Sequence, residues 1–151
     1  AGLAALPGAG LLVYTEVKRP GGPPVFRLVE LEVAPGVARE LAVRELPGSR
    51  DRWQAIVDGR PVGRPVLLRG FHGRIRPIAT AESWDGGGAA CNAFAFRFAD
   101  VAVADGRGGG WRPFVPGQRY RDGGFALRPA TRARALAAGA PAPYGFVAAA
   151  G

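Results

Sequence analysis

The chain has 151 residues, 48% of them apolar, which suits one domain with a hydrophobic core. Its 24 glycines and 14 prolines show no period of three, which excludes collagen, and no apolar run reaches the roughly 18 residues needed to cross a membrane. The net charge of +8 comes almost wholly from arginines scattered singly, a pattern that favours a GC-rich coding genome over a nucleic-acid-binding surface.

Strands are predicted along most of the chain, after a small-residue segment, 1–10, that we expect to be a flexible end. Apolar alternation and the intervening Gly and Pro residues set their limits. Residues 39–46 (RELAVREL) have a helical composition, but they lie too tightly between Pro and Gly for a stable helix, so we predict a strand. Only residues 131–138 are predicted as a short helix. The predicted strands are 11–18, 25–33, 39–46, 53–58, 66–69, 74–84, 91–103, 111–115, 120–127 and 143–147.

The clearest strand is 91–103. Its apolar side chains alternate through Phe94, Phe96 and Phe98, and then the parity switches to Val101 and Val103. One extra residue changes the face on which alternate side chains lie, so we predict a β-bulge near residues 99–100. The glycine-rich run that follows, 106–110, lacks the features of a phosphate-binding loop and is predicted to be a hairpin loop.

These strands, with no βαβ alternation and no internal repeat, predict an all-β, antiparallel two-sheet sandwich of the jelly-roll type, with residues 11–151 as a single domain. A closed barrel is the alternative. The chain begins Ala-Gly-Leu-Ala and has no methionine, as a chain would after removal of a signal peptide, although a shortened chain would look the same. We therefore expect a secreted or extracytoplasmic protein.

Few residues suit metal or nucleophilic chemistry. His72 is the single histidine and Cys91 the single cysteine, so neither an internal disulfide nor a His/Cys metal cluster is predicted. No Gly-x-Ser-x-Gly turn is present to display a serine nucleophile. We expect His72 to be a loop residue, and we predict no metal and no cofactor.

The strand predicted at 74–84 carries an unusual set of side chains. Because side chains alternate along a strand, Arg76, Thr80, Glu82 and Trp84 are expected on one face. Charge, a hydroxyl and a flat apolar ring together suit a sugar or a peptide. The same face could equally be an ordinary solvated surface.

Two further strands add candidate residues. Tyr14 and Glu16 form a similar pair on the strand 11–18, and Gln54 lies on the strand 53–58. If these strands are neighbours of 74–84, they line one concave groove.

Four short segments resemble a known family. YTEV at 14–17 and VAPG at 33–36 look like the Trp-Tyr-Glu strand and the following turn of the glutamic peptidases (eqolisins). AESW at 81–84 and FRFADV at 96–101 are similar to the family's Ala-Glu-Trp strand and the strand after it. The resemblance covers about residues 11–104. It implies a concanavalin-like β-sandwich with a concave sheet, and export.

The resemblance also implies a chemistry. Glutamic peptidases use a Gln–Glu pair to activate water, and Glu82 best matches the family's glutamate. The family's glutamine would precede residue 14, but residues 1–13 contain none, so Gln54 would have to serve as a displaced partner. This departure favours a relative without catalytic activity.

Three functions remain open at this point. The first is a non-catalytic domain that binds a peptide or glycan on one sheet face. The second is an enzyme, an acid-acting glutamic-type peptidase or another hydrolase, that uses Glu82 and Gln54. The third is a structural or assembly domain. Nucleic acid is not an expected partner, and the ligand and the oligomeric state stay open.

Overall fold

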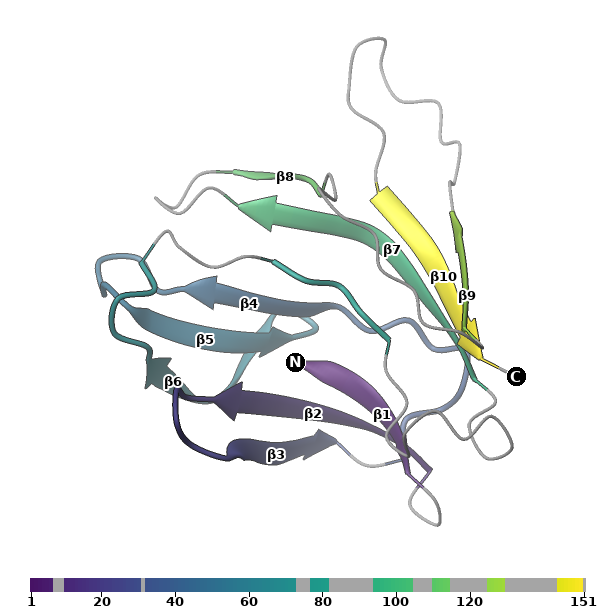
Figure 1. Ribbon diagram of the computed structural model, residues 1–151, viewed down its shortest axis with the longest axis horizontal. Helices are drawn as coiled ribbons and strands as arrows, with labels where there is room; N and C mark the ends of the chain where they lie inside the picture. Colours follow the sequence, from purple (N-terminus) through teal and green to yellow (C-terminus); the bar gives the residue numbers. More distant parts are fainter. Residues whose placement is uncertain are drawn as a thin grey trace, which may run out of the picture. The chain divides into compact units, whose positions relative to one another are not determined.

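The computed structural model describes residues 1–6, 10–30, 32–72, 77–81, 94–104, 110–114, 125–129 and 144–150 (Figure 1). These residues confirm an all-β fold with antiparallel pairing, and the described part contains no helix that could span a membrane. The chain divides into two compact units, Ala1–Ile75 and Arg76–Gly151. The prediction of a single domain over 11–151 therefore stays a prediction.

The first unit contains two antiparallel sheets of three strands each, and in both sheets every strand pairs with the next one along the chain (Figure 1). The first sheet has the order β1-β2-β3 and the second the order β4-β5-β6. Their strands are β1 (Gly2–Leu6), β2 (Gly10–Lys18), β3 (Pro24–Glu30), β4 (Leu41–Glu45), β5 (Arg52–Val57) and β6 (Arg60–Leu67). The strand predicted at 39–46 is confirmed by β4.

The two sheets of the first unit share one apolar core. Its buried members are Val13 on β2, Val57 on β5 and Val33, and both sheets contribute half-buried residues around them. The Val33 N–H donates to the Leu11 carbonyl at 2.8 Å, which ties the segment after β3 back to β2. The half-buried residues packed on this core are Leu3, Leu11, Val29, Leu41 and Val62.

The N-terminal segment departs from the prediction. The flexible end predicted for 1–10 is wrong for Gly2–Leu6, which forms β1 and pairs with β2 in the register Gly2↔Tyr14. The pairing places Leu3 opposite Val13 at the core, and Gly2 leaves space for the Tyr14 ring, because a Cβ atom there would lie 2.9 Å from that ring. Long-range pairing thus orders a segment whose small residues suggested a loose end.

The hairpin between β5 and β6 begins earlier than predicted. Asp58 and Gly59 both have positive φ angles, 48° and 74°, as in the two-residue turns that match the twist of a hairpin. β6 therefore starts at Arg60, well before the strand predicted at 66–69, and it contains Pro61 and Pro65. It is an edge strand, where a missing N–H need not break the ladder.

The second unit holds one four-stranded sheet in the order β8-β7-β10-β9. β7 pairs antiparallel with β8, and the hairpin loop predicted between them at 106–110 lies outside the described residues except for Gly110. The strands predicted at 120–127 and 143–147 appear in part as β9 and β10, which extend past the predicted C-terminal limits, while residues 120–124 and 143 lie outside the described part. The bounds are β7 (Phe94–Ala104), β8 (Trp111–Pro113), β9 (Phe125–Pro129) and β10 (Tyr144–Ala150).

The predicted bulge in β7 is confirmed. Val101 pairs with Tyr144, and Phe98 pairs with Phe146, so β7 has one more residue than β10 between these two pairs. Asp100 within the bulge has a φ of 52°. Phe98 then stacks on Phe146, with ring centroids 4.3 Å apart and planes 11° from parallel. The β-bulge is therefore the physical cause of the parity switch in the sequence.

The strand predicted at 74–84 is not found where the chain is described. Residues 77–81 lie outside any strand, so the prediction is wrong for them. Pro77 lacks the N–H that a ladder bond requires, which disfavours a regular strand here. Cys91 and the helix predicted at 131–138 lie outside the described residues.

Candidate functional site

The predicted binding face of 74–84 is only partly described. Arg76, Glu82 and Trp84 lie outside the described residues, and Thr80 is an exposed residue outside any strand. Their shared face therefore stays a prediction, as does the groove that they were expected to line with β2 and β5.

Gln54, the predicted partner of Glu82, is buried in the first unit with 5% of its surface exposed. Its side-chain amide donates to the carbonyls of Val62 and Ala55, at 2.8 and 2.9 Å. The ladder between β5 and β6 is irregular here, because Trp53 pairs with Val66 while Ala55 pairs with Val62. The Gln54 amide thus supplies a donor to backbone carbonyls at this break in the ladder.

This geometry predicts a structural cost for Gln54→Leu. The apolar side chain has a similar volume but cannot donate, so the partly buried carbonyls of Ala55 and Val62 lose this donor, at a cost of about 1–3 kcal/mol in unfolding free energy. Urea unfolding measures the loss, with Arg44→Leu as control, since Arg44 is the exposed cross-strand partner of Gln54 on β4. Equal stability of the two variants would contradict the structural role of the Gln54 amide.

Tyr14 and Glu16 lie on one face of β2, next to side chains of β3. Tyr14 pairs with Leu28 and Glu16 with Phe26, and the Tyr14 and Phe26 ring centroids are 6.0 Å apart with planes inclined by 46°. We call these four residues the Tyr14 face. Phe26 and Leu28 had not been identified from the sequence. The sequence of β3 did contain an indication of them, because it has apolar residues at adjacent positions. Side chains alternate along a strand, so some of these residues must lie on the face away from the core.

The exposed apolar surface of the first unit is concentrated on β3. Val25, Phe26 and Leu28 are 49%, 52% and 55% exposed, whereas each other described strand of the unit has at most one large apolar residue of this kind. β3 is also an edge strand, paired only with β2 in the described part of the chain. An exposed, apolar edge is a template for pairing with another strand.

A second cluster surrounds His72, which lies in a turn as predicted. Its Nδ1 is 2.8 Å from the Glu45 carboxylate, and its backbone N–H donates to Asp51 at 2.7 Å. Asp51 also donates its N–H to Glu45, at 2.5 Å. A cavity of about 380 Å³ opens beside the cluster, lined by Arg50, Asp51, Gly70 and His72.

The hydrogen bonds of this cluster indicate a structural role, in which the cluster holds the segment after β6 against the turn between β4 and β5. Backbone N–H groups, first that of Gly70 and then those of His72 and Phe71, hold the pKa of Asp51 below its usual value. The Asp51 carbonyl accepts the Leu68 N–H at 2.8 Å, so the segment after β6 is fastened to the turn between β4 and β5. Nowhere in the described ranges do three or more His, Cys, Asp or Glu side chains form a group that could hold a metal ion.

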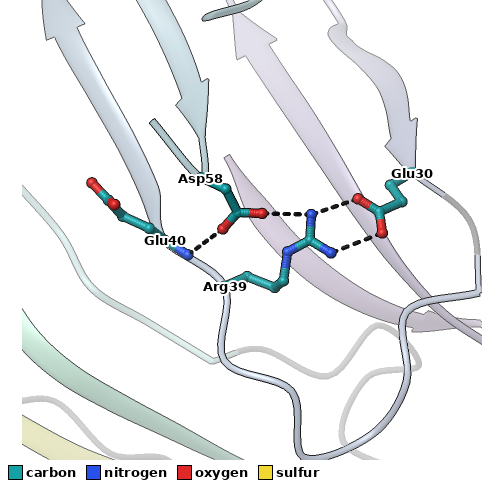
Figure 2. Close-up of polar contacts among 4 residues, drawn as sticks. All are labelled: Glu30, Arg39, Glu40 and Asp58. Atoms are coloured by element: carbon teal, nitrogen blue, oxygen red, sulfur yellow. Dashed lines mark hydrogen bonds and ion pairs between the residues drawn. The ribbon is translucent and has the colours of Figure 1, made fainter. Parts of the chain in front are cut away.

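A third polar group joins the two sheets of the first unit (Figure 2). Arg39 donates to both carboxylate oxygens of Glu30, at 2.8 and 2.5 Å, and its Nη2 lies 2.7 Å from Asp58. Asp58 in turn accepts the Glu40 N–H at 2.9 Å. The hydrogen bond from Arg39 is the largest cause of a lowered Glu30 pKa. Every member is bound to another member, so the group acts as a link between β3 and the β5–β6 turn.

Comparison with known proteins gave no match, whether with family models, curated proteins or solved structures. The resemblance to the glutamic peptidases therefore stays a prediction. Among the described strands of the first unit, β3 carries the largest group of exposed large apolar side chains, Val25, Phe26 and Leu28, beside the Tyr14 face.

Proposed function

We propose that this protein is a non-catalytic binding domain that takes an extended peptide alongside β3. The peptide adds a strand to the first sheet and covers the apolar side chains of its edge. Backbone hydrogen bonds supply affinity in this mode, and alternate side chains supply selectivity.

The observation that carries the proposal is the exposure of Val25, Phe26 and Leu28, each by about half, on one edge strand. Natural proteins usually protect such edges with charges, prolines or covering segments. Contiguous exposed apolar surface marks interaction sites more often than plain surface does. The clustering on β3 therefore supports binding at this edge over a uniformly solvated sheet.

A peptide has more support than a glycan. The Tyr14 and Phe26 rings are inclined by 46°, so they do not form the single flat platform on which a sugar ring would stack. The edge of β3 instead offers backbone donors and acceptors spaced for another strand. The predicted ligand-binding residues Tyr14 and Glu16 remain part of the proposed surface.

The fold proposed for this domain is a β-sandwich, and the core shared by the first and second sheets supports it. Export is also part of the proposal, because the resemblance to the glutamic peptidases implies it.

The test is selection from a display library of random linear peptides, followed by calorimetric titration of the best binders. Phe26→Ser combined with Leu28→Ser is expected to weaken binding at least about tenfold, which corresponds to about 1.4 kcal/mol. The matched control is Val43→Ser, an exposed valine on the edge strand β4. Selection of no peptide, or binding that survives the double change, would reject the proposed function.

A further inference from the structure

We infer that the peptide bound at β3 carries an apolar–acidic–apolar sequence, with its acidic side chain paired to Arg27. This inference rests on the proposed function and specifies the chemistry of its ligand. It follows from the order of side chains along β3 and from the charges around it.

The two faces of β3 offer different partners to an added strand. Phe26 and Leu28 lie on the Tyr14 face, and Arg27 lies between them on the opposite face. Side chains directly opposite on neighbouring strands interact, and they alternate between faces with the same period of two. A peptide strand beside β3 therefore sets two apolar residues against Phe26 and Leu28 and the residue between them against Arg27.

Arg27 is exposed and lies within ion-pair distance of no carboxylate in the described ranges, in contrast to Arg39, which contacts both Glu30 and Asp58. An exposed guanidinium that is not yet paired with a carboxylate favours a carboxylate ligand, which it can bind through two parallel N–H donors. The chemistry of Arg27 thus selects an acidic residue at the central position of the peptide.

Glu16 has little influence on this selection. It is exposed and pairs with Phe26 across β2 and β3, so Phe26 separates it from a peptide on the free edge, which lies two strand spacings, roughly 10 Å, away. The apolar positions of the motif are therefore selected by Phe26 and Leu28, and the acidic position by Arg27.

The positive charge of Arg27 argues against a second copy of this chain as the partner. An antiparallel β3–β3 pair centred on the strand would place Arg27 opposite Arg27. Like charges directly opposite are destabilising. The edge is therefore better suited to a peptide of complementary charge.

The experiment measures the affinities of four synthetic peptides by fluorescence anisotropy at low salt. The first carries Leu-Glu-Val between Thr residues, the second and third replace Glu by Gln or Lys, and the fourth replaces both apolar residues by Ser. Wild-type protein is expected to bind the Glu peptide roughly two- to fivefold more tightly than the Lys peptide, the range for an exposed ion pair, and salt should reduce the difference. The Ser peptide should bind most weakly.

Arg27→Glu is expected to reverse the order of the Glu and Lys peptides, while Arg44→Glu, at an exposed arginine on the edge strand β4, should leave it unchanged. Circular dichroism checks that both variants keep the sheet content of the wild type. Equal binding of the Glu, Gln and Lys peptides would overturn the motif and leave peptide binding standing. Failure of all four peptides would overturn the motif. If light scattering also shows a dimer that Phe26→Ser combined with Leu28→Ser breaks, a second copy occupies the edge and the proposed function is overturned as well.

Discussion

Val13→Asp is expected to abolish the folded state of the first unit. Val13 has 0% of its surface exposed and lies at the centre of the core that both sheets share, against Val33 and Val57. A carboxylate there would lose its water without gaining a partner, at a cost of several kcal/mol whether it stays charged or becomes protonated. Because a whole domain is stable by only about 5–15 kcal/mol, this single change removes most of the margin.

The matched control for this variant is Val43→Asp. Val43 lies on β4 of the same unit with 48% of its surface exposed, so the new carboxylate stays in water. A surface substitution of this kind is expected to change stability by no more than about 0.5 kcal/mol. Amide NMR spectra distinguish the two outcomes, because unfolding collapses the dispersed signals of residues 1–75. Dispersed signals in the Val13→Asp protein would show that the two sheets do not depend on this core.

The sequence predicted local features best. The bulge in β7 followed from the parity of Phe98 and Val101 within one strand, and no distant residue was needed to identify it. The strand at 39–46 was also decided locally, since Pro and Gly on either side left no room for a helix. In both cases the information that determines the structure lies within a few residues.

Features that depend on distant pairing were missed. Gly2–Leu6 has a weak strand pattern of its own, and it becomes β1 because β2 pairs with it and the Tyr14 ring fits over Gly2. Pro77 had the opposite effect, because the alternation around it is typical of a strand while its missing N–H removes a ladder hydrogen bond. Propensity and pattern are weaker than tertiary pairing in such segments.

The candidate site could be predicted only in part. Tyr14 and Glu16 were identified from their alternation on one strand, but their neighbours Phe26 and Leu28 required the β2–β3 register, which a sequence pattern does not fix. Gln54 was identified as a polar residue on the strand 53–58. Its role as a donor to backbone carbonyls depends on the irregular β5–β6 pairing. Residue type therefore indicated where polar chemistry exists, and the fold decided what each group contacts.

Arg39→Met is expected to lower the melting temperature at neutral pH and to raise the pKa of Glu30 toward its ordinary value. The substitution removes the hydrogen bonds that lower this pKa, and it leaves Glu30 with the charge of Asp58, which acts in the opposite direction. A lowered folded-state pKa stabilises the protein fully above the unfolded-state value of about 4.3, and this contribution is lost as the pH falls through the folded value. The stability curves of the wild type and the variant should therefore lie apart at neutral pH and converge in acid.

Two measurements check this expectation. Urea unfolding at a series of pH values gives the two stability curves, and carbon-detected NMR of the Glu30 carboxyl gives its pKa directly. The lowered pKa of Asp51 adds an acid dependence common to both proteins, so the difference between the curves isolates the contribution of Arg39. Arg44→Met, at an exposed arginine of β4, is the control and should leave the Glu30 pKa unchanged. If Glu30 titrates alike in wild type and Arg39→Met, the link between β3 and the β5–β6 turn does not depend on this ion pair.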